Sequence, residues 1–116
     1  MQLTLKSKKI WMYHEATDFR KSINGLSELV CTFLPDELYK GIFVFFNRQR
    51  DKLKILAWHG NGFILLYKRV EQGKFTIVNN ADSHFSIDET QLSWLVAGLD
   101  WHKMSQWKTL GYDEIM

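Results

Sequence analysis

The sequence predicts an α+β fold, built as a single domain over residues 1–116. Two observations predict it: β-rich runs separated by turn residues fill the middle of the chain, and an amphipathic helical stripe lies on either side of them. With 116 residues, of which 46% are hydrophobic, the chain is long enough for one core and too short for two ordinary domains. We therefore expect an antiparallel meander sheet of four to five strands, with two main helices packed on one of its faces.

The chain before the sheet predicts a short strand followed by a helix. Residues 10–13, Ile-Trp-Met-Tyr, are typical of an opening strand. Thr17 can cap a helix over about 18–33, in which apolar residues recur at spacings of three and four. Pro35 ends that helix, because the residue before a proline is pushed out of helical geometry. Cys31, the only cysteine, falls within this helix, where a buried structural thiol is expected.

The middle of the chain predicts strands with short connections. Asn61-Gly62 is a strong signal for a two-residue hairpin turn, and Arg48-Gln-Arg-Asp51 fits a four-residue loop. Because no connection is long enough to hold a crossover helix, neighbouring strands are expected to pair antiparallel. The β-rich runs cover residues 42–47, 52–58, 63–70 and 75–78.

A second helix is expected over about 87–99. Ser86-Ile-Asp-Glu89 has the spacing of a capping box, and apolar residues recur behind it at helical spacing. The stretch 100–116 is less regular, and its residues Trp101 and Trp107 indicate apolar surface near the end of the chain.

The two hairpin loops determine which side chains share a face of the sheet. A loop at 61–62 sets Lys54 opposite Arg69, and a loop at 48–51 sets Phe45 opposite Lys54. Both loops assign the same residues to each face. The division into faces therefore does not depend on one loop alone.

The two faces differ in character. One is apolar and is expected to pack against both helices. The other interleaves aromatic rings with cations, which suits single-stranded or distorted nucleic acid because bases stack on rings while Lys and Arg neutralise phosphates. Alternatively, the C-terminal segment or a second subunit covers its aromatic end, and only its basic end meets solvent. The apolar face comprises Ile42, Val44, Phe46, Leu53, Ile55, Ala57, Ile64, Leu66 and Val70, and the mixed face Phe43, Phe45, Asn47, Lys52, Lys54, Leu56, Trp58, Leu65, Tyr67 and Arg69.

Charge is divided unevenly along the chain. Residues 1–74 contain 13 of the 15 Lys and Arg and 7 of the 13 Asp and Glu, a balance of +6, whereas residues 75–116 have a balance of −4. The net positive charge of residues 1–74 favours an anionic partner, although a solvated surface without a partner would have the same composition. The single cysteine excludes a disulfide framework, and no stretch suits a signal peptide or a membrane helix. We therefore expect a cytoplasmic protein without a membrane partner.

No pattern in the sequence indicates a catalytic or metal site. The four histidines, at positions 14, 59, 84 and 102, lack the HxxxH or HxH spacing of metal ligands. Gly60-Asn-Gly62 lacks the Lys-Ser/Thr ending of a phosphate loop. A two-metal nuclease needs clustered carboxylates, and the expected strands contain almost none. We therefore expect no metal, no cofactor and no enzymatic activity.

Five blocks of the sequence are distinctive: Thr17-Asp-Phe-Arg-Lys-Ser-Ile-Asn-Gly-Leu26, Phe43-Val-Phe-Phe-Asn-Arg-Gln-Arg-Asp-Lys-Leu-Lys-Ile-Leu56, Trp58-His-Gly-Asn-Gly-Phe63, Tyr67-Lys-Arg-Val-Glu-Gln-Gly-Lys-Phe75 and Gln91-Leu-Ser-Trp-Leu-Val-Ala-Gly-Leu-Asp100. Together they resemble the TnpB-type accessory protein, the Orf2-like, second-reading-frame product of the insertion-sequence sixty-six family of bacterial transposable elements. The resemblance spans about residues 13–101 and leaves the tail, 102–116, outside it.

The resemblance implies a non-catalytic accessory factor of DNA transposition and recombination, encoded beside a separate DDE-type transposase and a further small protein. One hypothesis is that it binds DNA at the element ends. Another is that it docks on the transposase or the small protein without touching DNA, through apolar surface that includes Trp101 and Trp107; a nuclease is a third, which the missing carboxylates disfavour. Whether the chain forms a homodimer is left open. The residues expected to bind DNA are Arg20, Lys21, Arg48, Arg50, Lys52, Lys54, Trp58, Tyr67, Lys68 and Arg69.

Overall fold

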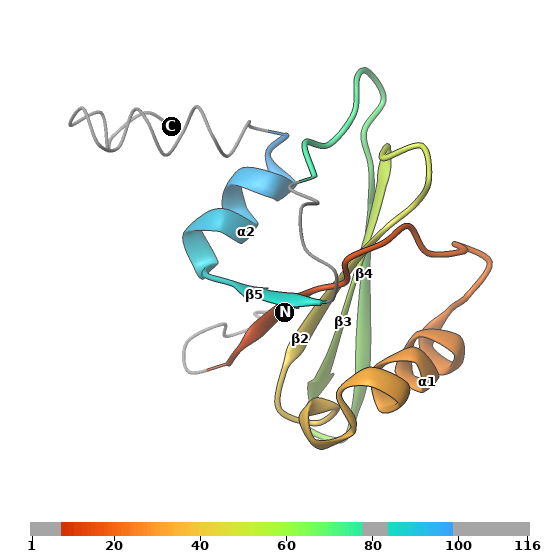
Figure 1. The fold of residues 1–116 in the computed structure, drawn as a ribbon, viewed down its shortest axis with the longest axis vertical. Coiled ribbons are helices and arrows are strands. Elements are labelled where there is room, and N and C mark those ends of the chain that lie inside the picture. Colours follow the sequence, from red (N-terminus) through yellow and green to blue (C-terminus); the bar gives the residue numbers. More distant parts are fainter. Residues whose placement is uncertain (1–7, 78–83, 99–116) are drawn as a thin grey trace.

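The structure, a computed structural model, describes residues 8–77 and 84–98. Its centre is a twisted sheet of five strands in the order β4-β3-β2-β1-β5 (Figure 1). The pairs β2–β3, β3–β4 and β1–β5 are antiparallel. The predicted α+β class with a mostly antiparallel sheet is therefore confirmed. The strands are β1 Ile10–Met12, β2 Ile42–Phe46, β3 Lys52–His59, β4 Gly62–Arg69 and β5 Phe85–Ile87; the helices are α1 Ile23–Phe33, the 3₁₀ helix η1 Pro35–Glu37 and α2 Glu89–Val96.

One strand pair departs from the predicted meander. Strands β1 and β2 are parallel, with Ile10 opposite Ile42 and Met12 opposite Val44. The reason lies in the connection, because α1 lies between the two strands in the chain and parallel neighbours need such a long crossover. The sequence predicts the opening strand, but short connections join only the strands β2, β3 and β4 that follow it.

The two helices lie on opposite faces of the sheet, so the prediction that both pack on one face is wrong (Figure 1). Helix α2 packs on the predicted apolar face through Leu92 and Leu95. Helix α1 packs on the mixed face through Leu26 and Val30. The phenylalanines of the mixed face therefore belong to one of two cores, whereas Tyr67 of the same face stays exposed. The strand residues beneath α1 are Phe43, Phe45 and Leu56, and those in the core with α2 include Ile42, Val44, Phe46, Leu53 and Ala57.

Helix α1 begins at Ile23, later than predicted, and its N-cap is Ser22 rather than Thr17. It ends as predicted: Leu34 has φ −141° and leaves helical geometry directly before Pro35. Cys31 lies on the exposed side of this helix, which corrects the expectation of a buried thiol.

Helix α2 is also shorter than predicted, and its cap is formed by other residues. Asp88 is the N-cap: its carboxylate accepts from the backbone N–H of Gln91, and the Gln91 side chain accepts from the backbone N–H of Asp88. Ser86, the predicted cap, is instead the middle residue of β5. The capping box therefore begins at Asp88, two residues later than predicted. Strand β5, which contains Ser86, was not predicted.

Of the two predicted hairpin registers, the β2–β3 register is correct and the β3–β4 register is not. The β2–β3 pairing is as predicted, with Phe45 opposite Lys54. The β3–β4 pairing is shifted by two residues, so that Tyr67, not Arg69, lies opposite Lys54. The loop is Gly60-Asn61, and Gly60 has the positive φ of 65° that a type II′ turn requires at its first position. Because the shift is an even number, every residue stays on its predicted face.

The predicted strand at 75–78 does not form within the described residues, although its side chains are buried. Phe75 is 2% exposed and Ile77 is 8% exposed, and both join the core beneath α2. The backbone N–H of Phe75 donates to the carbonyl of Arg50 at 2.7 Å. The segment therefore fills the core without pairing as a strand, and residue 78 lies outside the described part.

Candidate nucleic-acid interface

An open groove lies between two connecting segments at one end of the sheet. One wall is the segment that precedes α1, and the other is the loop between β2 and β3. The groove has a volume of about 560 Å³. We call it the basic groove. It is lined by Thr17, Asp18, Phe19, Arg20, Asn47, Arg48, Gln49, Lys52 and Tyr67.

Lys54 holds the first wall in place. Its side chain is only 7% exposed, and its Nζ donates to the carbonyl oxygens of Phe19 at 2.9 Å and Lys21 at 2.7 Å. The ammonium also lies 4.9 Å from the centre of the Phe19 ring. Burial lowers the pKa of Lys54, and the nearby Asp18 charge opposes that shift. A buried cation that bonds two carbonyls is poorly placed to reach a phosphate, so the structure gives no support to the predicted phosphate contact of Lys54.

Two backbone features complete this wall. The N–H of Thr17 donates to the carbonyl of Phe46 at 2.8 Å, which ties the segment to the end of β2. At the start of α1, a Cβ built on Gly25 would lie 3.0 Å from Cβ of Lys21. Glycine therefore permits the close approach of Lys21, which offsets its low helical propensity at this position.

Asn47 holds the second wall. Its side chain is nearly buried, and Oδ1 accepts from the backbone N–H groups of Asp51 at 3.1 Å and Lys52 at 3.0 Å. Its Nδ2 donates to the Asp51 carboxylate at 2.6 Å and to Oε1 of Gln49 at 3.2 Å. The hydrogen bond from Asn47 is the main reason that the pKa of Asp51 is lowered. Arg50, at the corner of the loop, has the left-handed φ of 60°.

The cations of the two walls differ in how far they are neutralised. The Arg20 side chain donates to the Asp18 carboxylate through Nε, at 3.1 Å and 3.0 Å to its two oxygens, and through Nη2 at 2.6 Å. Lys52 lies 3.6 Å from an oxygen of Asp51. Arg48 and Arg50 are exposed, and neither forms an ion pair with any residue of the described part of the chain. The second wall thus presents the positive charge that is least compensated.

We predict that the carboxyl group of Asp18 titrates at about pH 2 rather than at its ordinary 3.8, because the hydrogen bonds from Arg20 favour its charged form. Its folded-state pKa is lowered, so its contribution to stability is present above pH 3.8 and is lost as the pH falls through about 2. NMR titration of the carboxyl carbon measures this pKa directly. The Arg20→Gln variant should return the pKa towards 3.8; an unchanged value would contradict the assignment to Arg20.

The structure brings together only part of the predicted DNA-binding set. Arg20, Arg48, Lys52 and Tyr67 line the basic groove. Arg50 and Lys21 do not line it. Arg50 follows the lining residue Gln49, and Lys21 follows Arg20 and offers its carbonyl to Lys54. Arg69 lies opposite Lys52 in the sheet and forms an ion pair with Glu71 at 2.9 Å. Contact with nucleic acid remains a prediction for all of these residues.

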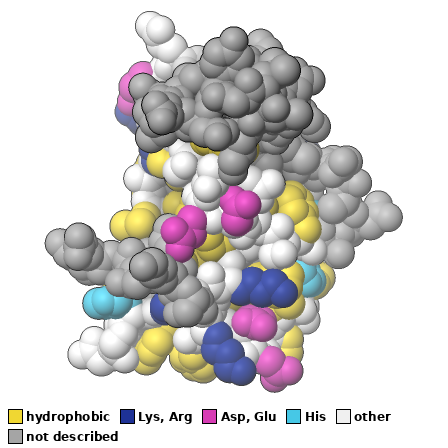
Figure 2. All heavy atoms as spheres, turned by 90° about the vertical axis from the view of Figure 1, so that its left-hand side faces the viewer, with side chains coloured by type: hydrophobic (Ala, Val, Ile, Leu, Met, Phe, Trp, Pro, Cys, Tyr) yellow, Lys and Arg dark blue, Asp and Glu magenta, His cyan; other side chains and the backbone are white. Residues whose placement is uncertain are grey.

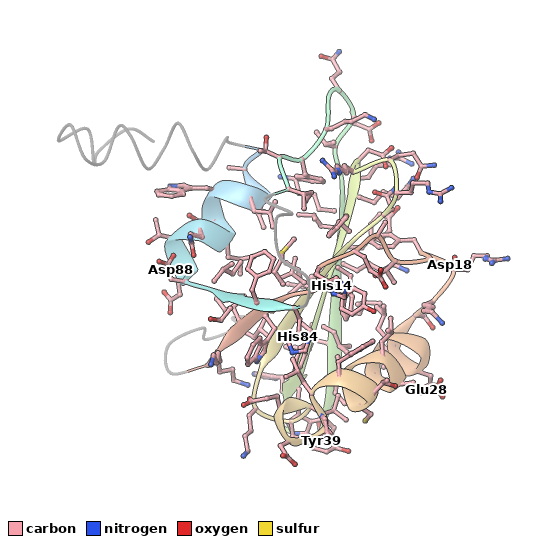
Figure 3. The ribbon with its side chains drawn as sticks, viewed as in Figure 1. His14, Asp18, Glu28, Tyr39, His84 and Asp88 are labelled. Carbon is pink, nitrogen blue, oxygen red and sulfur yellow. The ribbon has the colours of Figure 1, made fainter. Side chains whose placement is uncertain are left out.

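Two other predicted residues lie away from the groove. Trp58 belongs to an aromatic cluster with Tyr39 and Phe63. The centre of its ring lies 5.0 Å from the ring centre of each of these residues. Lys68 is on the α2 side of the sheet, where its Nζ donates to the carbonyl of Val96 at 2.6 Å. Figure 3 shows Tyr39 at the lower end of the molecule, below α1, far from Asp18 in the first wall. Neither residue therefore lines the groove, and their contact with nucleic acid remains a prediction.

The predicted protein-contact residues Trp101 and Trp107 lie outside the described residues. The groove also contains residues that the sequence analysis did not select, namely Thr17, Phe19 and Gln49. Asn47 was placed on the mixed face but given no function. An asparagine four residues before an aspartate at a hairpin loop is a usable signal, because Asn and Asp side chains commonly bond the backbone of turns.

The side of the molecule that carries β5 and α2 has a different surface. Figure 2 shows acidic, basic and hydrophobic side chains interspersed there. Asp88 and Glu89, at the start of α2, are exposed on this side. The described part of this side therefore has no concentration of cations like that of the second wall.

Neither a metal site nor a membrane helix is found where the structure can be described. Across residues 8–77 and 84–98, no three His, Cys, Asp or Glu side chains are grouped so that they could hold a metal ion. Over the same residues, no helix is long and apolar enough to span a bilayer.

Comparison with known protein families matches residues 8–106 to the family described as "IS66 Orf2 like protein". The chain belongs to this family. All residues that line the basic groove lie within the matched range. The family associates the chain with insertion-sequence transposition, in an accessory role, and is not known to be catalytic.

Two relatives come from Sinorhizobium fredii. One, named "Uncharacterized protein y4jC", is 37% identical over 99 residues, which cover 84% of this chain and 85% of the relative. The other, "Uncharacterized protein y4hO", is 30% identical over 102 residues, which cover 86% of this chain and 89% of the relative. No solved structure matches this chain. The family match therefore identifies the family. The groove must be interpreted from its own geometry.

Proposed function

We propose that the protein is a non-catalytic accessory factor of insertion-sequence transposition that binds DNA through the basic groove. The observation that carries this proposal is the second wall, where Arg48 and Arg50 are exposed, unpaired within the described chain and held on a loop fixed by Asn47. Cations on an ordered loop suit phosphate, because little backbone freedom is lost on binding. The element ends are the DNA that we propose, and the transposase is the proposed partner in that complex.

The chemistry of the groove supports binding rather than catalysis. Its lining contains three cations and one carboxylate, and that carboxylate already accepts hydrogen bonds from Arg20. Hydrolysis of DNA by a two-metal mechanism needs several free carboxylates close together. Phosphate binding needs only the cations, because each one that replaces counterions on the DNA contributes to affinity.

The test is the double variant Arg48→Ala/Arg50→Ala, measured for DNA binding by anisotropy across a salt series. If both arginines contact phosphates, the slope of log affinity against log salt concentration should flatten by about two units. Binding at low salt should weaken for all DNA sequences alike, because phosphate contacts do not read sequence.

A matched control is Lys9→Ala/Lys40→Ala, which removes two exposed lysines just before β1 and β2, at the other end of the parallel strand pair. This variant loses the same charge and should keep the slope of the wild type. Both variants must still unfold cooperatively. An unchanged slope in the folded Arg48/Arg50 variant would reject the groove as the DNA contact.

The second candidate function is docking on a protein partner, and the aromatic cluster favours it. Tyr39 is 59% exposed and stacks on Phe63, with ring centres 5.9 Å apart. Exposed tyrosines packed beside tryptophan are common at protein interfaces. If DNA binding fails in the salt series, this cluster is the surface to test against the transposase by Tyr39→Ala.

A further inference from the structure

We infer that the basic groove takes an unpaired nucleotide, with its base stacked on Tyr67 and its flanking phosphates on Arg48 and Lys52. This inference rests on the proposed DNA-binding function and specifies the class of DNA. The three side chains come from three places in the chain, namely β4, the β2–β3 loop and the start of β3, and all line the same groove.

The ring of Tyr67 is supported on one side and open on the other. It is 53% exposed, yet its centre lies 6.4 Å from that of Phe19 and 5.8 Å from the ammonium of Lys54. Because Lys54 is itself bonded to the first wall, the surroundings of the ring are fixed before any ligand arrives. A pre-positioned ring loses little freedom when a base stacks on it.

An exposed ring inside a cationic groove distinguishes single-stranded from double-stranded DNA. Bases within a duplex already stack on their neighbours, so they have no free face for Tyr67. An unpaired base does, and stacking on an aromatic side chain is worth about 1–3 kcal/mol per base. The groove volume of about 560 Å³ also lies in the range typical of sites for one small molecule.

The experiment compares one oligonucleotide, single-stranded and as a duplex, on wild type and on Tyr67→Leu. We expect wild type to prefer the single strand, and Tyr67→Leu to weaken single-strand binding about tenfold, which removes most of that preference. Tyr67→Phe keeps the ring and should stay within about twofold of wild type. A single strand containing 2-aminopurine, whose fluorescence is quenched by stacking, should be quenched by wild type and not by Tyr67→Leu.

The control is Tyr39→Leu, which removes a tyrosine of similar exposure outside the groove and should bind like the wild type. If wild type binds both forms equally and Tyr67→Leu changes nothing, while Arg48→Ala/Arg50→Ala weakens both, the inference falls and DNA binding stands. If wild type binds neither form, the proposed function falls, and this inference falls with it.

Discussion

Replacing Lys54 by alanine is expected to lower the free energy of unfolding by about 3 kcal/mol. The substitution removes two hydrogen bonds from a charged donor to the carbonyls of Phe19 and Lys21, each worth about 1.5–3 kcal/mol. It also removes the buried stem of the side chain and leaves a gap beneath the first wall. Folding of the variant no longer has to desolvate the ammonium group, which offsets part of this loss, so the sum of the two bonds is an upper bound. Chemical denaturation monitored by tryptophan fluorescence measures the change.

Two further substitutions separate the causes. Lys54→Met keeps most of the side-chain volume but loses the ammonium group, its two hydrogen bonds and its contacts with the Phe19 and Tyr67 rings. The free energy of unfolding should fall by about 1–2 kcal/mol. Lys52→Met, two residues earlier on the same face and partly exposed, should change stability by less than about 0.5 kcal/mol. Hydrogen exchange should rise in residues 17–22 of Lys54→Met and not of Lys52→Met. Equal effects of the two methionine variants would show that Lys54 is an ordinary surface lysine.

The faces of the sheet could be predicted because alternation in strands is strict. Side chains two apart share a face, so the β3–β4 register error of two residues left the assignment of Lys54 and Tyr67 intact. The turn itself was harder to place, because Gly60-Asn61 and Asn61-Gly62 are both plausible hairpin loops. Only the pairing of the whole strand distinguishes them.

What covers each face could not be predicted, since coverage is a property of topology and not of local pattern. The mixed face contains enough apolar residues to form a core, and α1 covers it. The short strand β1 and the missed strand β5 decide this arrangement, because β1 lies parallel to β2 and carries the chain into α1. Three-residue strands give almost no periodic signal. The sequence therefore could not indicate that α1 and α2 lie on opposite sides.

The same limit explains the mixed outcome at the groove. Arg48, Lys52 and Tyr67 were selected from their shared face and loop, and they do line one groove. Lys54 has the same alternation as Lys52, yet it lies beneath the segment that leads into α1. Lys68 was selected for its charge alone and is on the other face. Composition identifies cations, but only the path of the connecting segment decides which of them meets solvent.

Replacing Asn47 by alanine is expected to lower the free energy of unfolding by about 2–3 kcal/mol. The substitution leaves the backbone N–H groups of Asp51 and Lys52 without their acceptor, and a buried donor left unpaired costs about 1–3 kcal/mol. The Asp51 carboxylate also loses its 2.6 Å partner, so its lowered pKa should rise towards the ordinary value of 3.8. Denaturation gives the first quantity and NMR titration of Asp51 gives the second.

The control for Asn47 is Gln49→Ala, which removes a single side-chain contact of 3.2 Å in the same loop. Gln49→Ala should lower the free energy of unfolding by less than about 0.5 kcal/mol, as for most surface substitutions. In Asn47→Ala, both arginines of the second wall keep their charge, but the loop that positions them is released. DNA affinity should then fall, because part of the binding free energy is spent on ordering the loop. The slope of log affinity against log salt concentration should stay near the wild-type value, because no cation is lost. Weakened DNA affinity with unchanged stability would instead mean that Asn47 touches the DNA and does not shape the loop.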